Sequence, residues 1–357
     1  MVKMRENTLE DFMIYFHNDY SEGCHKKVLE SLIMSNMEQT PGYGEDDYCR
    51  EAARKIRAIC ENDDLAVHFL VGGTQTNLTV IAAALRPHQA VLTVADGHIN
   101  VHETGAIEST GHKVLALPTA DGKITANQIE EAMQAHLQED GPEHMVQPGM
   151  VYLSFPTEIG TIYSHTELRS IREVCDKYSL PLFVDGARLG YGLCSPECDI
   201  TLPELTQLVD VFYIGGTKVG ALFGEAVVIV NEALKKDFRY SIKQHGGMLA
   251  KGRLLGLQFS TLFTDDLYFA ISQQAIDEAM RIKSALQTKG IAFLIDSPTN
   301  QQFPIFNKKQ LATLSDDFLF SVWQQIDEEH TAVRICTSWA TKRENVDKLI
   351  AAIGRIP

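Results

Sequence analysis

The stretch that decides the fold is residues 181–224, PLFVDGARLGYGLCSPECDITLPELTQLVDVFYIGGTKVGALFG. It contains two short apolar runs, Pro181–Val184 and Val209–Ile214, both rich in β-branched or aromatic residues. Such runs are typical of strands that are buried on both faces of a parallel sheet. The first run ends at Asp185, and the second passes through two glycines and a threonine to Lys218. Because ligands of such sheets bind beyond the carboxyl ends of the strands, an acid and an amine from different strands can meet there.

This pair of side chains suits one cofactor in particular. Pyridoxal phosphate has an aldehyde that reacts with an amine and a pyridine nitrogen that needs a carboxylate. Lys218 and Asp185 would supply these two groups. The stretch alone leaves two alternatives open, namely a buried ion pair between the two residues and two solvated loop ends.

Composition restricts the class of protein. The chain has 357 residues, of which 45% are hydrophobic and 22% are charged, as in an ordinary globular protein with two domains. Its formal net charge of −15, with no strongly basic run, argues against a nucleic-acid partner or an anionic membrane surface. No uncharged apolar run approaches the length of a membrane span, and the N-terminus, MVKMRENTLEDFMIYF, is too acidic for a signal peptide.

The cysteines indicate the compartment. Seven cysteines are scattered along the chain, as expected of reduced thiols in a cytoplasmic protein. Cys194 and Cys198 are four residues apart, but no second pair or histidine cluster completes a zinc site. We therefore expect no bound metal.

A second informative segment lies upstream. The apolar run Ala66–Val71 is followed by Gly72-Gly73-Thr74-Gln75-Thr76-Asn77, where a helix is expected to begin. Glycines let the backbone approach a ligand closely, and the free amides of a helix start favour a phosphate. The alternative is an ordinary helix cap on a glycine turn. His98, which follows the strand Ala90–Val94, falls at the same expected edge of the sheet, either as a functional residue or as a structural one.

The order of elements predicts the architecture. Strands alternate with helices or loops from residue 66 to residue 230, which indicates a wound α/β domain. A long helix over about 265–288 is followed by a small C-terminal α/β domain. We expect an N-terminal arm over residues 1–23, a large domain over 24–260 and a small domain over 261–357. In the small domain, we expect strands at Ala292–Ile295, Gln302–Ile305 and Thr331–Thr337, and helices at Ser315–Gln325 and Arg343–Ile353.

These segments together resemble a known family. The chain resembles the threonine aldolase and β-eliminating lyase family, pyridoxal-phosphate enzymes of the aspartate-aminotransferase-like fold (fold type I), in which a large domain with a mostly parallel sheet carries a small C-terminal domain. The resemblance extends from NDYSEG (18–23) to VRICTSW (333–339). Its strongest elements are DGARL (185–189) and GGTKVGA (215–221), supported by PGYGEDD (41–47), VGGTQTN (71–77), HINVHETGA (98–106) and PTEIGTIY (156–163).

The resemblance implies a role for each matching residue. Lys218 matches the Schiff-base lysine, Asp185 the acid that pairs with the pyridine nitrogen, and His98 the histidine that stacks on the ring. The residues implied to bind the phosphate are Gly73, Thr74 and Gln75, and Thr217 is also implied to contact the cofactor.

The resemblance also implies two arginines for the substrate. Arg188, which is implied at the cofactor as well, and Arg334 match the arginines that hold the substrate α-carboxylate. A planar guanidinium suits a bidentate carboxylate contact, which favours arginine at both places. Alternatively, Arg188 pairs with Asp185 and Arg334 is a surface charge.

Two departures from the family pattern concern the substrate. Where many aldolases have ENTH, this chain has SFPTE (154–158), so Thr157 stands near the place of a histidine. Where they have an RSDT-like arm, this chain has HNDY (17–20), with Asn18 in place of a serine that contacts the substrate. A branch with phenylserine-aldolase-like members shares the PTE-type loop. The base that takes the β-hydroxyl proton therefore stays open between His98, a water on Thr157 and another group.

The activity implied by the resemblance is the retro-aldol cleavage of a β-hydroxy-α-amino acid to glycine and an aldehyde. The alternatives are β-elimination or transamination at the same cofactor, and a cofactor-binding regulator without turnover. The resemblance further implies a homodimer or homotetramer with active sites between subunits. Lys243 and the loop 243–247 are candidates to reach a neighbour's phosphate.

Overall fold

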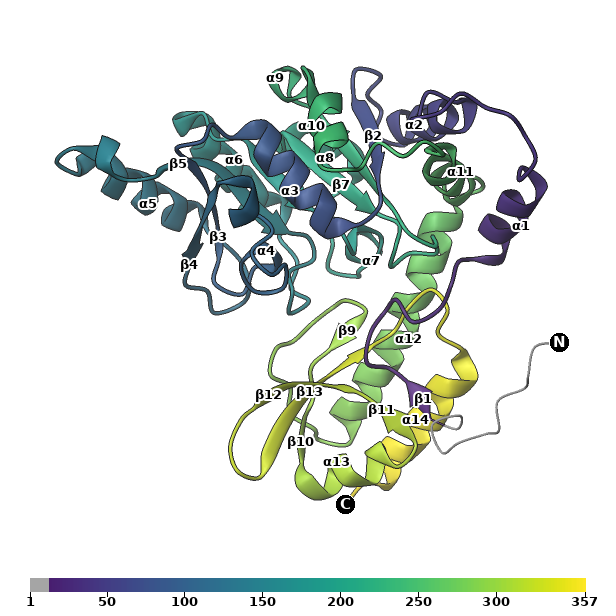
Figure 1. The fold of residues 1–357 in the computed structure, drawn as a ribbon. Coiled ribbons are helices and arrows are strands. Elements are labelled where there is room, and N and C mark those ends of the chain that lie inside the picture. Colours follow the sequence, from purple (N-terminus) through teal and green to yellow (C-terminus); the bar gives the residue numbers. More distant parts are fainter. Residues whose placement is uncertain (1–12) are drawn as a thin grey trace.

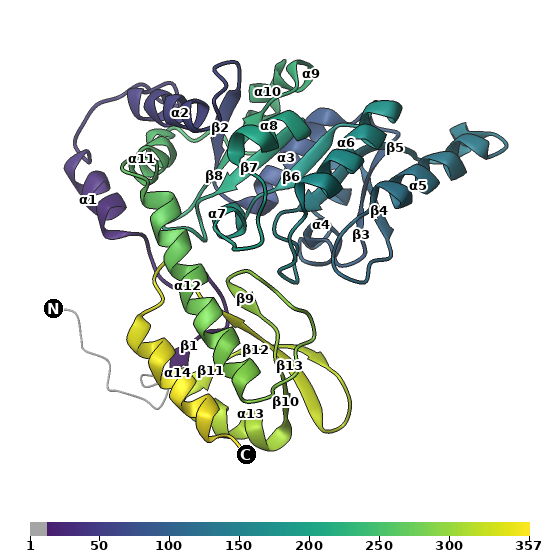
Figure 2. The same cartoon turned by 180° about the vertical axis from the view of Figure 1, so that it is seen from behind.

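The computed structural model describes residues 13–357, which form two lobes joined by the long helix α12 (Leu267–Thr288) (Figures 1 and 2). Residues 1–12 of the predicted arm lie outside the described part. The larger lobe is built on a seven-stranded sheet and the smaller lobe on a four-stranded sheet. Among residues 13–357, none of the helices combines the length and the apolarity that crossing a membrane requires.

The large sheet confirms the predicted wound, mostly parallel arrangement. Its strands lie in the order β2-β8-β7-β6-β5-β3-β4. The last five of these run parallel to one another, whereas β8 runs antiparallel to both of its neighbours. The strands are β2 (Ala66–Leu70), β3 (Gln89–Val94), β4 (Lys113–Leu117), β5 (Gln147–Ser154), β6 (Leu182–Asp185), β7 (Val211–Gly215) and β8 (Glu225–Ile229).

Different helices cover the two faces of this sheet. On one face, Val80 and Ile81 of α3 pack in one apolar cluster with Phe183 (Figure 1). On the opposite face, Leu168 of α6 and Leu205 of α8 belong to a second cluster (Figure 2). The helices of this lobe are α1 (Lys26–Met34), α2 (Asp47–Ile59), α3 (Gly73–Ala84), α4 (His98–Val101), α5 (Ala126–Gln138), α6 (His165–Tyr178), α7 (Leu189–Leu193), α8 (Leu202–Leu208), α9 (Glu232–Lys235), α10 (Phe238–Gln244) and α11 (Arg253–Leu262).

The small lobe includes part of the N-terminal arm. β1 (Ile14–Tyr15) pairs with β11, and Phe16 lies in the apolar core of this lobe. The predicted boundary between residues 260 and 261 falls within α11 and stays a prediction. The other elements are β9 (Gln301–Gln302), β10 (Ile305–Asn307), α13 (Lys308–Ser315), β11 (Phe318–Leu319), β12 (Ser321–Gln325), β13 (His330–Cys336) and α14 (Arg343–Arg355).

Two predictions for the small lobe were wrong. The segment Ser315–Gln325 is not a helix, because α13 ends at Ser315 and β12 then pairs with β13. Trp323 in β12 packs edge-on against Phe303 at 5.1 Å between ring centroids, and aromatic residues of this kind favour strands. The predicted strand Ala292–Ile295 is reduced to a single bridge.

The sheet gathers several loop starts at one edge. The carboxyl ends of the five parallel strands lie at this edge, and β8 begins there because it runs in the opposite direction. The chain reverses its winding at β3, which has β4 on one side and β5 on the other. Ligands of wound sheets bind at such a reversal, so the segments after β3, β5, β6 and β7 surround the expected site.

Candidate active site

The carboxylate of Asp185 is buried and fully hydrogen-bonded. Its Oδ1 accepts from the Tyr213 hydroxyl at 2.5 Å and from the Ala187 amide at 2.9 Å. Its Oδ2 accepts from the Tyr152 hydroxyl at 2.5 Å and from the Asn77 side-chain amide at 3.1 Å. Four donors therefore fix both oxygens at the end of β6.

These contacts keep the acid ionised. Burial alone would raise the pKa of Asp185, but the charge of His98 and the hydroxyls of Tyr152 and Tyr213 lower it overall. An ionised carboxylate in this position can hold a protonated ring nitrogen.

Glycines bring the ends of β6 and β7 together. A Cβ atom on Gly186 would lie 1.8 Å from the Tyr213 carbonyl oxygen, and one on Gly215 would lie 2.2 Å from the Ala187 carbonyl oxygen. Neither position has room for a side chain. The two motifs DGAR and GGTK therefore meet backbone to backbone at the sheet edge where the sequence predicted that Asp185 and Lys218 could converge.

Lys218 lies in the turn after β7 with an unpaired amine. Its carbonyl accepts a hydrogen bond from the Tyr191 hydroxyl at 2.6 Å, whereas its Nζ has no hydrogen bond or ion pair with residues 13–357. Burial and the charge of Arg188 lower the pKa of Lys218, although the carboxylates of Asp19 and Glu158 act in the opposite direction. A lowered pKa makes the neutral, nucleophilic amine easier to reach.

His98 shares a hydrogen-bond network with Asp185. Its Nδ1 lies 2.8 Å from Oε1 of the buried Glu103, and the same oxygen accepts from Asn77 at 2.7 Å. Asn77 thus bridges the two functional groups. Burial opposes protonation of His98, but the Glu103 hydrogen bond and the charges of Glu158 and Asp185 raise its pKa overall. The structure brings His98 to the predicted edge, and its stacking role stays a prediction.

The predicted phosphate segment forms the first turn of α3. Its cap residue, Gly72, has no side chain that could bind the first amides. The first backbone hydrogen bond of the helix is donated by the Thr76 amide to the Gly72 carbonyl. The amides of Gly73, Thr74 and Gln75 are therefore available to an anion. A Cβ atom on Gly73 would lie 3.1 Å from the Tyr213 hydroxyl oxygen, which places this turn beside the Asp185 network.

Two other predicted cofactor residues use their side chains within the protein. The Gln75 side chain accepts from the Val71 amide at 3.1 Å and donates to the His245 carbonyl at 3.0 Å. The Thr217 hydroxyl accepts from the Gly224 amide at 3.0 Å. Their contacts with a cofactor stay predictions.

Arg188 pairs with the arm, not with Asp185. Its Nε and Nη2 donate to the two carboxylate oxygens of Asp19 at 2.7 and 3.0 Å. The Asp19 side chain is fully buried, and Arg188 is almost so. Arg188 therefore does not pair with Asp185, which was the alternative. Its guanidinium group follows the end of β6, where the substrate was expected.

Arg334 is held from three sides in the small lobe. Its Nη2 donates to the His17 carbonyl at 3.2 Å and its Nη1 to the Gln301 side chain at 3.4 Å. The guanidinium also lies 5.4 Å from the centroid of the Trp323 ring, a cation–π contact. It is partly buried, so it is not a free surface charge.

The two residues that depart from the family pattern are engaged locally. The Asn18 Oδ1 accepts from the Tyr20 amide and the Ser21 hydroxyl, both at 2.9 Å. The buried Thr157 hydroxyl lies 2.6 Å from that of Thr161, whose amide also donates to it at 3.1 Å. Their predicted contacts with a substrate stay untested.

Several residues of the site were missed by sequence reasoning. Asp19 follows Asn18 in the arm but was not assigned a role, and Glu103 stands inside the quoted segment 98–106. Tyr152 and Tyr213 looked like core residues of apolar strands. Glu158 accepts from the hydroxyl of Ser154 at 3.1 Å, and Ser154 is the residue that pairs with Asp185 in the sheet register. Asp19, Glu103 and Glu158 carried a signal, because each is a charge inside a quoted motif, whereas the two tyrosines carried none.

The residues present fit pyridoxal phosphate. An ionised buried acid, an unpaired lysine with a lowered pKa and a helix start with free amides lie at one sheet edge, as the cofactor's ring nitrogen, aldehyde and phosphate require. When bound, the cofactor would be held by Asp185, Lys218 and the first turn of α3. Fold and site together define a pyridoxal-phosphate enzyme of fold type I.

Comparison with known proteins gives the family. Residues 22–308 match the beta-eliminating lyase family, so the chain belongs to that family. A low-specificity L-threonine aldolase of Pseudomonas aeruginosa is 30% identical over 75% of this chain and 76% of its own. The solved structure of a Leishmania major threonine aldolase is 44% identical, with a TM-score of 0.93 over 96% of this chain and 98% of that one.

A more distant structure confirms the fold alone. An aspartate aminotransferase of Thermus thermophilus superposes with a TM-score of 0.69 at 14% identity, covering 97% of this chain and 92% of that one. The protein is therefore a pyridoxal-phosphate-dependent carbon–carbon lyase similar to the threonine aldolases.

Proposed function

We propose that the enzyme cleaves a β-hydroxy-α-amino acid of the L-threonine, L-allo-threonine or phenylserine type to glycine and an aldehyde. The observation that carries this proposal is the unpaired Lys218 amine, whose pKa is lowered by burial and by Arg188 at the same edge as the ionised Asp185. The names of the similar proteins from Pseudomonas aeruginosa and Leishmania major support the same reaction.

The chain's own residues would select the bond that breaks. When bound, the cofactor supplies a ring that withdraws electrons from Cα of the amino acid. Asp185 keeps a negative charge at the ring nitrogen, and Arg188 and Arg334 hold the α-carboxylate. Fixing the carboxylate at two points orients the Cα–Cβ bond, and positioning of this kind contributes several kcal/mol to catalysis.

We assign removal of the β-hydroxyl proton to His98. Glu103 holds its Nδ1, which leaves Nε2 to accept a proton. The Thr157 hydroxyl already contacts both the hydroxyl and the amide of Thr161, so it has little capacity left for a substrate. Glu158, whose charge acts on His98, is the second carboxylate or imidazole group here that could accept this proton.

The test combines spectroscopy with product analysis. Lys218→Ala removes the amine, so the visible absorption of the purified protein and its change on borohydride treatment should be lost. Lys251→Ala, which changes an exposed lysine, serves as the control. The wild-type enzyme should release an aldehyde and glycine from at least one of L-threonine, L-allo-threonine and phenylserine.

Other products would contradict the proposal. Pyruvate with ammonia would indicate β-elimination, and glutamate formed from 2-oxoglutarate would indicate transamination. A cofactor-loaded protein that turns over none of these substrates would be a binding protein.

We further propose a homodimer, or a homotetramer made of two dimers, with active sites at the subunit interface. The segment after the arm exposes Ile33, Met34 and Met37 at 66%, 85% and 88% of their surface. Side chains of this size are rarely left together in water, which favours cover by a second copy. Lys243, whose Nζ lies 5.0 Å from the centroid of the Tyr43 ring, remains our candidate for a neighbour's phosphate.

A further inference from the structure

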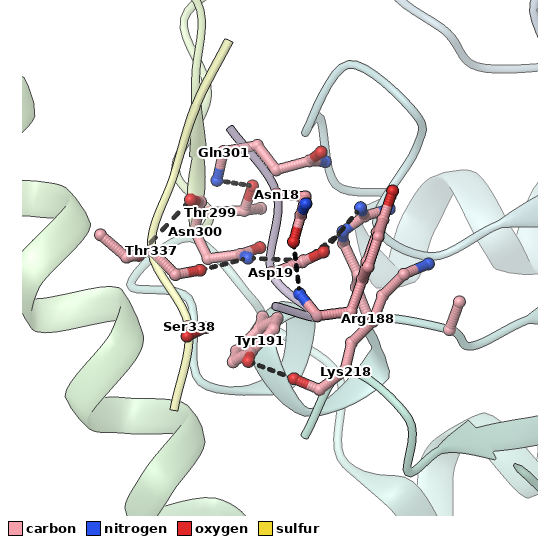
Figure 3. Close-up of polar contacts among 12 residues, drawn as sticks. Asn18, Asp19, Arg188, Tyr191, Lys218, Thr299, Asn300, Gln301, Thr337 and Ser338 are labelled. Atoms are coloured by element: carbon pink, nitrogen blue, oxygen red, sulfur yellow. Dashed lines mark hydrogen bonds and ion pairs between the residues drawn. The ribbon is translucent and has the colours of Figure 1, made fainter. Parts of the chain in front are cut away.

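Asp19 lies where three parts of the chain meet. It belongs to the N-terminal arm, Arg188 to the large lobe and Asn300 to the small lobe (Figure 3). Its carboxylate accepts two hydrogen bonds from Arg188, at 2.7 and 3.0 Å, and one from the Asn300 side-chain amide, at 3.0 Å. Asp19 is fully buried, so its charge depends on these partners.

The geometry of the pair divides the guanidinium of Arg188 into two edges. Asp19 takes the side edge, formed by Nε and Nη2. The terminal edge, formed by Nη1 and the second hydrogen of Nη2, makes no hydrogen bond to residues 13–357. A guanidinium has five donors in a fixed plane, so holding one edge sets the direction of the other. The free edge is a ready bidentate site for a second carboxylate.

Asp19 itself is held rigidly. Asn300 also donates to the Thr337 carbonyl at 2.9 Å, which fixes the amide to the residue that follows β13. The arm is anchored before Asp19 by the Cys336 amide, which donates to the Phe16 carbonyl at 2.7 Å. A carboxylate fixed in this way can orient an arginine without moving toward it.

The arm also contacts the other substrate arginine. The His17 carbonyl, two residues before Asp19, accepts from Nη2 of Arg334 at 3.2 Å. One short segment of the arm therefore contacts both arginines that we assign to the substrate carboxylate, although each arginine belongs to a different lobe.

We propose that Asp19 is a positioning residue, which holds the side edge of Arg188 so that the terminal edge receives the α-carboxylate of the amino acid. The inference rests on the proposed function, because it takes the carboxylate of an amino-acid substrate as the ligand of Arg188. It assigns to the arm a part in substrate recognition through its buried acid, independent of any contact by Asn18.

If Asp19 competes with the substrate for Arg188, the predicted change in glycine affinity has the opposite sign. If Asp19 occupied the place of the substrate carboxylate, the substrate would have to displace it, and removing its charge would tighten binding. If Asp19 positions Arg188, removing its charge loosens the guanidinium and weakens the binding of carboxylates. The sign of the change in affinity therefore separates the two roles.

The experiment compares glycine with methylamine, which lacks only the carboxylate. Both amines are titrated into the pyridoxal-phosphate-loaded wild type and into Asp19→Asn and Asp19→Ala, with visible absorption as the readout. We expect glycine to bind at least tenfold more weakly to both variants, while the affinity for methylamine changes less than twofold. Glu22→Gln, an exposed acid in the same arm, should change neither affinity.

Each other outcome overturns the inference. Equal losses for glycine and methylamine would assign Asp19 a purely structural role, and tighter glycine binding would make it a competitor. Thermal unfolding of the apoprotein shows whether a variant has folded, and Asn300→Ala, which keeps the ion pair, should lose less glycine affinity than Asp19→Ala. If the wild-type enzyme binds methylamine but not glycine, the inference alone is refuted. If it binds neither amine, the proposed function is refuted.

Discussion

At the scale of single residues, the site is organised by how buried charges are satisfied. An unpaired buried carboxylate is costly, and proteins usually avoid the cost by protonating the group. Asp185 stays ionised because four hydrogen-bond donors hold its carboxylate, and its pKa is lowered further when His98 is protonated. Lys218 shows the reverse, since its ammonium has no partner among residues 13–357 and burial lowers its pKa. These opposite environments assign the charged form to the acid and favour the neutral form of the amine.

Removing one donor should therefore weaken the acid's hold on the cofactor. Tyr213→Phe deletes the hydroxyl that donates to Asp185, so the pKa of Asp185 should rise. We expect the dissociation constant of pyridoxal phosphate to increase about tenfold, the effect of losing one hydrogen bond to a charged group. Equilibrium dialysis of the reconstituted apoprotein measures this. Tyr178→Phe, whose hydroxyl contacts α5, is the control; equal affinities in all three proteins would contradict the prediction.

The pairing of His98 with Glu103 predicts a shift in pH dependence. Glu103 helps to raise the pKa of His98, so Glu103→Gln should lower that pKa. Because a base must be neutral to accept a proton, the acidic limb of the profile of kcat against pH should move to lower pH. The His98 resonance in the apoprotein, followed by NMR, should titrate at lower pH as well. Glu108→Gln, which changes an exposed acid shortly after that segment, should leave the pH profile and the His98 titration unchanged. An unmoved His98 titration in Glu103→Gln would refute the coupling.

At the scale of elements, the reversed strand β8 delivers an additional acid to the site edge. Its first residue, Glu225, is buried and accepts from the Gly216 amide at 3.0 Å. Burial raises the pKa of Glu225 to about 8, although a hydrogen bond from Thr217 and the charge of Lys218 act against this. Between its ordinary pKa and this value, the folded protein keeps a proton that the unfolded chain releases.

This difference predicts that Glu225 makes the fold less stable as pH rises. The unfolded chain binds fewer protons than the folded one between about pH 5 and 8, so the free energy of unfolding falls over that range. Glu225→Gln removes this loss, and should gain on the order of a few kcal/mol relative to wild type between pH 5.5 and 8.5. Thermal unfolding of the apoproteins at both pH values measures it, with exposed Glu232→Gln as the control. A constant difference between variant and wild type would contradict the prediction.

Much of the fold could be predicted because the strands near the site are apolar on both faces. The runs Pro181–Val184 and Val209–Ile214 were predicted as strands from residue type alone, and the structure places β6 and β7 there. Prediction failed for Ser315–Gln325, where strand pairing and the Trp323–Phe303 contact decide the structure. The role of Asp19 also escaped prediction, because its partners Arg188 and Asn300 are 169 and 281 residues away. Contacts of that separation leave no local pattern.

At the scale of the whole molecule, the arm connects the two lobes at the site. It pairs with β11 in the small lobe, contacts Arg334 through His17 and holds Arg188 in the large lobe through Asp19. If Arg188 and Arg334 bind one carboxylate, as we propose, residues from both lobes must be in place before that carboxylate can bind. We propose that a second subunit covers the exposed side chains of α1 and the following loop.

The subunit interface can be tested at the level of function. We propose that Lys243 acts on the phosphate of a neighbour, although the His245 carbonyl of the same loop contacts Gln75 of its own chain. Lys218→Ala and Lys243→Ala should each inactivate or strongly weaken the enzyme. If the site combines Lys218 of one subunit with Lys243 of another, co-refolding equal amounts should restore about a quarter of wild-type activity, because half of the dimers are mixed and each has one intact site.

The same experiment excludes the alternative arrangement. If Lys243 serves its own chain, every site in a mixed dimer carries one defect, so mixing restores nothing. The two changes Met34→Glu and Met37→Glu introduce negative charges and should give monomers by light scattering, because these side chains, 85% and 88% exposed in the single chain, are expected to be covered in the dimer. Monomers that keep full activity would show that the site is complete within one chain, whereas inactive monomers that still bind pyridoxal phosphate weakly would place the missing group on the neighbour.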